Sequence, residues 1–181
     1  MKRMSYISII KKAKISLVWL SILILPQLIA GCKVSYSFSG VNISPEITTV
    51  SVDYFQNRAP VVQAQLSQLF TDALIDKIQA NTSLELIPGV GQVSFSGEIK
   101  NYDTKPTAIT ESETAARNRL TISVTVVYTN SVEPELDFES SFSRYEDFDS
   151  SQNLADVENE LIDLIVESLI EDIFNKAFVN W

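Results

Sequence analysis

The chain has 181 residues, with 14 Lys and Arg against 23 Asp and Glu, which gives a formal net charge of −9. It contains no histidine and one cysteine, so Ser-His-Asp triads, Cys-His pairs and histidine-based zinc sites are excluded. The acidic balance also argues against nucleic acid as a partner, because nucleic-acid-binding domains carry basic surfaces. This inventory leaves carboxylate chemistry open, which is considered below. We predict no catalytic residues, no metal and no cofactor.

An apolar run, 15–30, follows five basic residues within the first 14 positions. The run has 16 residues and includes a proline, whereas an uncleaved membrane helix needs roughly 20 apolar residues. Gly31 precedes Cys32. An ordinary secretory signal followed by an incidental cysteine is the less favoured alternative, because Cys32 is the only cysteine and no disulfide partner can explain it. We predict that residues 1–31 are a lipoprotein signal peptide, cleaved between Gly31 and Cys32, and that Cys32 carries the lipid.

After this cleavage nine basic and 23 acidic residues remain, a formal charge of −14. Such a surface is not held to anionic lipid by general electrostatics, so membrane attachment must come from the acyl chains on Cys32. We expect a lipidated N-terminal tether at 32–46 and a single domain at 47–181.

Alternation of apolar and polar side chains indicates strands, and apolar spacing of three to four residues indicates helices. In chain order the sequence predicts a strand at 47–55, a helix from Pro60 to about Asn81, strands at 92–102, 117–130 and 136–148, and a helix from Asn153, its N-cap, to about Phe178. A polar connection is expected at 103–115.

These elements predict an α+β fold in which two helices pack on one face of a four-stranded mixed sheet, in the order strand, helix, three strands, helix. The three later strands form an antiparallel meander, and the first strand joins through a helical crossover. The other sheet face is expected to be open and rich in small hydroxyl side chains, namely Thr49, Ser51, Ser94, Ser96, Thr121, Ser123, Thr125, Ser141 and Ser143.

An acidic stripe follows one face of the last predicted helix at i+3 and i+4 spacing, comprising Asp156, Glu160, Asp163, Glu167 and Glu171. It suggests either a metal or catalytic feature or a solvated helix face. The solvated face is favoured, because like charges at this spacing repel unless water screens them.

Four stretches resemble the lipopolysaccharide-assembly lipoprotein family LptE: CKVSYSFSG at 32–40, ISPEITTVSVDYFQNRA at 43–59, SSFSRYEDF at 140–148 and IFNKAFVNW at 173–181. The resemblance extends over essentially the whole mature chain. It implies two helices on a four-stranded sheet, no enzymatic activity, and a position in the outer membrane as a plug inside the barrel protein LptD. It further implies that the pair inserts lipopolysaccharide into the outer leaflet and that the plug helps the barrel to assemble.

Lipopolysaccharide is anionic like this chain, so any contact with it requires a local basic group. Strand parity places Lys100, Arg117 and Arg119 on the open face near the end of a hairpin formed by 92–102 and 117–130. Arg forks suit phosphate, and these residues are the candidate lipopolysaccharide contact. The alternative, which is favoured on pattern alone, is pairing with nearby Glu98, Glu111 or Glu113.

Two other functional classes stay open at this point. One is a periplasm-facing binding or pilotin-like escort lipoprotein of another envelope complex. The other is a carboxylate-based glycosidase, which is disfavoured because its two acids must converge in a cleft. The tail 178–181 either covers the core or contacts a partner, and the first is the more common role of aromatic residues after a helix.

Overall fold

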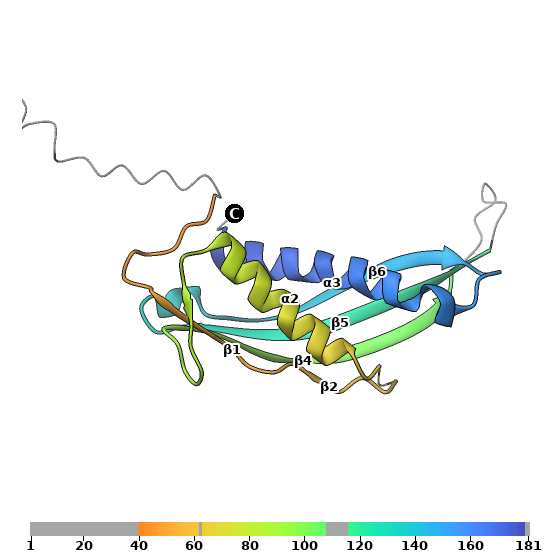
Figure 1. The fold of residues 1–181 in the computed structure, drawn as a ribbon, viewed down its shortest axis with the longest axis horizontal. Helices are drawn as coiled ribbons and strands as arrows, with labels where there is room; N and C mark the ends of the chain where they lie inside the picture. Colours follow the sequence, from red (N-terminus) through yellow and green to blue (C-terminus); the bar gives the residue numbers. More distant parts are fainter. Residues whose placement is uncertain (1–39, 62, 108–115, 180–181) are drawn as a thin grey trace, which may run out of the picture. The chain divides into compact units, whose positions relative to one another are not determined.

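The computed structural model describes residues 40–61, 63–107 and 116–179. They form strands β1 (Thr49–Val52) and β2 (Gln56–Asn57), helix α2 (Leu66–Asn81), strands β3 (Glu85–Leu86), β4 (Val93–Pro106) and β5 (Arg117–Asn130), the 3₁₀ turn η2 (Pro134–Leu136), strand β6 (Phe138–Asp149) and helix α3 (Leu154–Phe178). Both helices lie on one face of the sheet (Figure 1), which confirms the predicted two-layer α+β class.

The strand order in the sheet is β3-β1-β4-β5-β6, and β2 pairs with β4 beside this path. β1 is parallel to both of its neighbours, whereas β5 is antiparallel to β4 on one side and to β6 on the other. The mixed sheet, the helical crossover and the meander are therefore confirmed. The predicted count of four strands is too low, because β2 and β3 have two residues each and are too short to show alternation.

The first predicted strand, 47–55, is interrupted after Val52. The backbone N–H of Asp53 donates to the carbonyl of Phe95 at 2.8 Å, so the chain continues beside β4. Beyond Val52, however, the side chains that face the core are not those that strict alternation predicts. Phe55 is fully buried and its N–H donates to Thr71 Oγ1 at 3.1 Å, whereas Tyr54 is 53% exposed. Strict alternation along 47–55 predicts that Tyr54 shares the face of Val50 and Val52, and the interruption after Val52 places it outward instead.

The hairpin of β4 and β5 is longer than predicted, because β4 extends to Pro106 within the expected polar connection. Pairing continues to Pro106 opposite Asn118, with one irregularity between Ile99 and Asn101. The extension depends on backbone hydrogen bonds to β5, which side-chain polarity does not reveal.

The helix starts differ in how well they follow local signals. α2 begins at Leu66 instead of Pro60, and Gln63 Oε1 accepts from the N–H of Gln65 at 2.7 Å and of Leu66 at 2.9 Å. α3 begins as predicted, with Asn153 Oδ1 accepting from the N–H of Ala155 at 3.3 Å. Asp156 in its first turn and Lys176 in its last both suit the helix dipole.

Phe178 belongs to the core, with 2% of its surface exposed and ring centroids 5.8 Å from Phe95 and 5.3 Å from Phe174. Core cover is therefore confirmed for Phe178, while residues 180–181 lie outside the described part of the chain. The carbonyl of Phe178 also accepts from the N–H of Asn42 at 2.8 Å, which ties the end of the expected tether to the end of α3. Gly31, Cys32 and the rest of 1–39 lie outside the described residues.

Gly97 in β4 has no room for a side chain. A Cβ built there would lie 2.0 Å from the carbonyl oxygen of Thr125 and 2.8 Å from the ring of Phe55, and the φ angle is +154°. The strand therefore requires glycine at a position that faces the layer of aromatic side chains.

Gly97→Ala is expected to lower the free energy of unfolding by about 2–4 kcal/mol, because the methyl group must displace backbone of the neighbouring strand. Urea unfolding followed by circular dichroism measures this change. The adjacent Ser96→Ala is the control, with an expected change within about 0.5 kcal/mol. Equal stability of the two variants would contradict the packing described at Gly97.

Candidate functional site: the open sheet face

The sheet face opposite the helices carries paired hydroxyl side chains. Cross-strand hydrogen bonds join Ser94 to Thr129 at 2.6 Å, Ser123 to Ser143 at 2.8 Å and Thr125 to Ser141 at 3.1 Å. Each pair stands directly opposite in the antiparallel register. Because these hydroxyls already form hydrogen bonds with one another, covering the face with another surface costs little free energy of desolvation.

One member of the predicted hydroxyl set is buried instead. Ser51 is only 3% exposed, because the turn at 88–91 folds over it. Its Oγ accepts from the N–H of Gly91 at 3.1 Å, and a Cβ at Gly91 would lie 2.8 Å from the backbone of β1. The contact joins residues 40 positions apart, so strand parity alone does not indicate it.

A shallow depression of about 480 Å³ lies on this face over Gly97. Hydroxyls of Ser96, Thr125 and Ser141 line it, together with the half-exposed ring of Tyr54. Gly97 contributes only backbone to this depression, because a Cβ there would point to the other face of the sheet, toward Phe55. The sequence contained no signal for the depression beyond an isolated glycine within a strand pattern.

Lys100 lies beside this depression and forms an ion pair with Glu98. Arg58 Nε lies 3.8 Å from the same carboxylate. The hydrogen bond from Lys100, together with both positive charges, lowers the pKa of Glu98. Lys100 thus has the partner that the alternative interpretation of the sequence named.

Arg119 forms a bidentate ion pair with Asp147 of β6, with Nε–Oδ1 and Nη2–Oδ2 distances of 2.7 and 2.9 Å. Its guanidinium also stacks 3.6 Å from the ring centroid of Tyr145. These hydrogen bonds raise the pKa of Arg119 and lower the pKa of Asp147. Sequence reasoning missed this partner, because the register that places Asp147 opposite Arg119 becomes known only with the sheet.

Arg117 is exposed and stands opposite Asp149 in the register. Its charge contributes to the lowered pKa of Asp149, after the hydrogen bonds that this carboxylate receives from Ser151. Glu111 and Glu113, the other partners considered, lie outside the described residues.

The three candidate basic residues share the open face but do not form one cluster. The irregularity in β4 places Lys100 next to the pairing of Asn101 with Ser123, four residues along β5 from Arg119. At about 3.4 Å per residue this corresponds to about 14 Å. Lys105 stands directly opposite Arg119 and pairs with Asp103, so the end of the hairpin gathers Lys105, Arg117 and Arg119.

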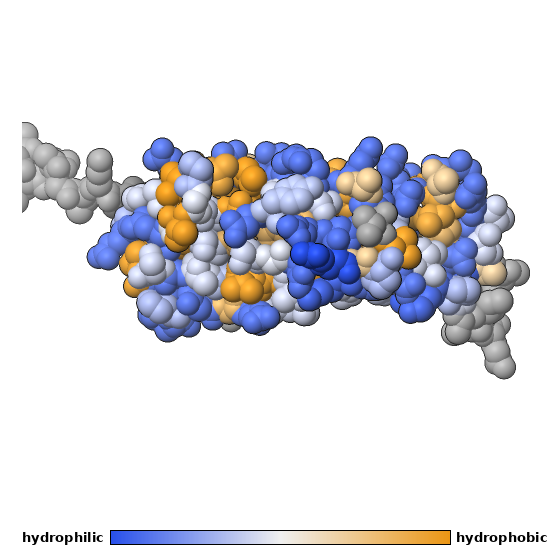
Figure 2. All heavy atoms as spheres, turned by 90° about the horizontal axis from the view of Figure 1, so that it is seen from below, coloured by the Kyte–Doolittle hydropathy of each residue, from blue (hydrophilic) through white to orange (hydrophobic). Residues whose placement is uncertain are grey.

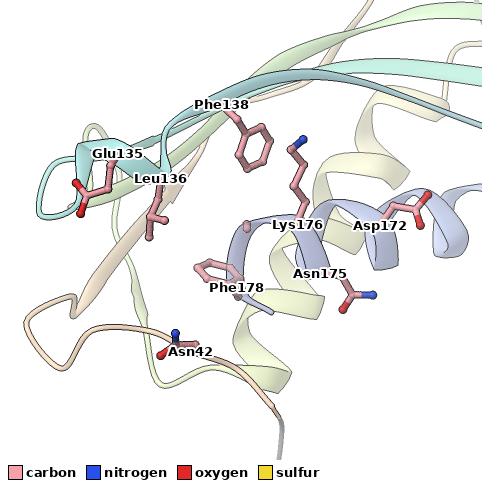
Figure 3. A pocket seen from close by; sticks show the side chains of 9 residues that line it. Asn42, Glu135, Leu136, Phe138, Asp172, Asn175, Lys176 and Phe178 are labelled. Atoms are coloured by element: carbon pink, nitrogen blue, oxygen red, sulfur yellow. The ribbon is translucent and has the colours of Figure 1, made fainter. Parts of the chain in front are cut away.

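A second cavity, of about 610 Å³, lies where the end of α3 meets η2 and Asn42 (Figure 3). Lys176 and Phe138 lie close together on its wall, with Nζ 5.0 Å from the ring centroid. Asp172 on the same wall is already engaged by Arg144 in two hydrogen bonds of 2.6 Å each. Of the three charged side chains that line this cavity, Asp172 is engaged by Arg144, and Lys176 lies beside the ring of Phe138.

Neither a metal centre nor a membrane-spanning helix is present in the described part of the chain. No group of three or more Cys, Asp or Glu side chains within 40–61, 63–107 and 116–179 is placed to hold a metal ion. Within the same ranges, neither helix has the length and apolar character needed to cross a bilayer.

Figure 2 shows the surface of the domain on the side of β1 and β2. Small patches of apolar residues are separated there by polar residues.

The fold and this surface define a class: a two-layer α+β domain with an open, hydroxyl-rich sheet face. The sequence model of the family described as "LptE: Lipopolysaccharide-assembly" matches residues 47–177. The chain therefore belongs to the LptE family, a non-enzymatic family of the lipopolysaccharide-assembly type.

Among solved structures, the chain is similar to a minor lipoprotein from Acinetobacter baumannii (11% identity, TM-score 0.48, covering 72% of this chain and 92% of that one). It is also similar to the uncharacterized lipoprotein B from Nitrosomonas europaea (16% identity, TM-score 0.48, covering 80% and 88%). A third similar structure is the hypothetical protein CT253 from Chlamydia trachomatis (10% identity, TM-score 0.49, covering 72% and 98%). Curated protein sequences contain no match to the chain.

Asp147→Asn is expected to lower the urea midpoint at pH 7 by a small amount, because it removes the bidentate partner of Arg119. The folded-state pKa of Asp147 lies below its unfolded value of about 3.9, so its contribution is complete above that pH. As the pH falls through the folded pKa the contribution is lost, and the two midpoints converge. Asp53→Asn, on an exposed residue of the same face, is the control. A gap for Asp147→Asn that stays constant down to pH 2 would contradict this origin.

Proposed function

We propose that this protein is the LptE-type plug and assembly factor of the outer-membrane barrel LptD and assists the insertion of lipopolysaccharide into the outer leaflet. Acyl chains on Cys32 hold it to the outer membrane after cleavage at Gly31. The match of the family to residues 47–177 carries the proposal. Because the family is non-enzymatic, we expect the surfaces of the domain to carry its function through contacts with partners.

The open sheet face supports contact with a barrel wall. Wide barrels have polar interiors that are filled by a plug or by water. The face offers hydroxyls that are paired across the strands and carries charges mostly in ion pairs, so little desolvation opposes contact.

Lipopolysaccharide contact is proposed at Lys100, Arg117 and Arg119. All three lie on the open face, and Arg117 and Arg119 stand near the end of the hairpin. Two of the three have carboxylate partners, Glu98 and Asp147. A phosphate must therefore compete with these carboxylates, and the contact is expected to be weaker than one made by unpaired arginines.

The role is tested by depleting the protein from its cells and restoring it as the wild type or as Cys32→Ser. Depletion is expected to abolish surface lipopolysaccharide and to leave LptD incompletely assembled. The wild type should restore both and purify with LptD in equal amounts. Cys32→Ser should restore them poorly, although its melting temperature equals that of the lipidated domain.

Two outcomes would overturn this proposal. Normal surface lipopolysaccharide after depletion would exclude a role in its assembly. Purification in equal amounts with a different envelope protein, without LptD, would favour the escort role for another complex.

The triple variant Lys100→Gln, Arg117→Gln and Arg119→Gln is expected to weaken lipopolysaccharide binding about tenfold, because it removes the three basic groups proposed to contact phosphate on this face. Binding is measured with purified protein and labelled lipopolysaccharide. Lys77→Gln, Arg144→Gln and Lys176→Gln remove the same charge from the helix side and are the matched control. Equal binding by both triple variants would exclude the proposed contact.

A further inference from the structure

A groove of about 570 Å³ runs between the two helices on the side away from the sheet. The helices run in the same direction (Figure 1). Lys77 pairs with Glu171 toward their C-terminal ends, and Leu66 and Ile162 line a common hollow toward their N-terminal ends. On α3 the groove is lined from Asp163 to Glu171, which at 1.5 Å per residue is about 12 Å.

The floor of this groove is apolar. Val166 and Ile170 of α3 are 2% and 4% exposed, and Leu69 and Ala73 of α2 are half-buried beside them. Ala73 and Ala80 are small, so α2 does not fill the space above the floor. A partner side chain placed here would find apolar atoms beneath it on both helices.

Carboxylates form the rim on both sides: Asp72 and Asp76 on α2, and Asp163, Glu167 and Glu171 on α3. Lys77, the only basic residue of the lining, is held by Glu171 and lowers the pKa of that carboxyl. Asp72, Asp76, Asp163 and Glu167 have no ion-pair partner within 40–61, 63–107 and 116–179. The groove therefore joins an apolar floor to an uncompensated negative rim.

The backbone adds to this charge. The C-terminal end of α2, which lines the groove at Ala80 and Asn81, carries the negative end of the helix dipole. α2 has no basic residue in its last turn to balance it. Because α3 is parallel to α2, its dipole has the same direction and does not cancel that of its neighbour.

We infer that this groove docks a segment of a partner protein in which Lys or Arg side chains flank apolar ones. The apolar residues lie on the floor, and the basic residues reach the carboxylates at either rim. Recognition of a helix in a groove of this kind needs both the apolar floor and the charged rim. Burial on the floor supplies affinity, and the charges fix the position of the segment along the groove.

Other occupants match these observations less well. Anionic lipid head groups would meet a rim of the same sign. A second copy of this chain offers few basic groups, with nine basic against 23 acidic residues after the leader. The inference depends on the groove alone and is independent of the proposed role with LptD.

The experiment places the photo-crosslinker p-benzoylphenylalanine at Ala80, on the groove, or at Ala155, which is exposed outside it, in the full chain expressed in its own cells. Irradiation followed by mass spectrometry identifies the crosslinked segment. From Ala80 we expect one protein segment with at least two Lys or Arg beside the crosslinked apolar residue, and we expect no crosslink to it from Ala155.

Variants then test the chemistry of the contact. Asp76→Asn, Asp163→Asn and Glu167→Gln together should lower the yield from Ala80 about tenfold. Glu46→Gln, Glu85→Gln and Glu133→Gln change the net charge equally outside the groove and should leave the yield unchanged. Ala73→Leu, which fills the floor, should also lower it, whereas Ala155→Leu should not.

The inference is overturned by a crosslink from Ala80 to lipid, to a second copy or to this chain's own leader. It is equally overturned by a partner segment without basic residues, by the absence of any crosslink, or by equal losses in the two charge triples. Thermal unfolding of each variant verifies that it is folded. Purification with LptD is scored separately, so failure of this inference and failure of the proposed function can be told apart.

Discussion

The pairing of β4 with β5 is the constraint on which the rest of the domain depends. These two 14-residue strands are paired from Val93 opposite Asn130 to Pro106 opposite Asn118. β1 and β2 add to the outer side of β4, and β6 adds to the outer side of β5. Both helices cover the face that this ladder makes apolar (Figure 1). A slip of one residue in its register would exchange the two faces, exposing the core side chains and burying the hydroxyls.

The same register distributes the charges. It places Arg119 opposite Asp147, and Lys100 shares the open face with Glu98, so the charges of this face are largely compensated within the sheet. The helix layer differs, because the acidic stripe predicted to be a solvated face borders a groove whose rim is only partly balanced by Lys77. The domain thus presents a nearly neutral hydrogen-bonding face on one side and a negative groove on the other.

These two surfaces suit different partners at the same time. A paired hydroxyl face is adapted to broad contact with a polar wall, where the cost of removing water is small. A narrow groove with charged rims is adapted to one segment of defined sequence, for which charge complementarity supplies specificity. In the proposed assembly the lipid anchor at Cys32 determines where the domain is held, and these surfaces determine what it contacts.

The α+β class, the meander, the N-cap at Asn153 and the outward parity of Arg117 and Arg119 could be predicted from the residues alone. They depend on local periodicity and short-range hydrogen bonds. The sequence stretches that resemble the LptE family, at 32–40, 43–59, 140–148 and 173–181, also indicated the family to which the chain belongs. Four features become known only from the folded domain: the partner of Arg119, the burial of Ser51 under the turn at Gly91, the outward position of Tyr54 and the groove between the helices. Each of these joins residues far apart in the chain through register or close packing, and neither is encoded in the spacing of neighbouring side chains.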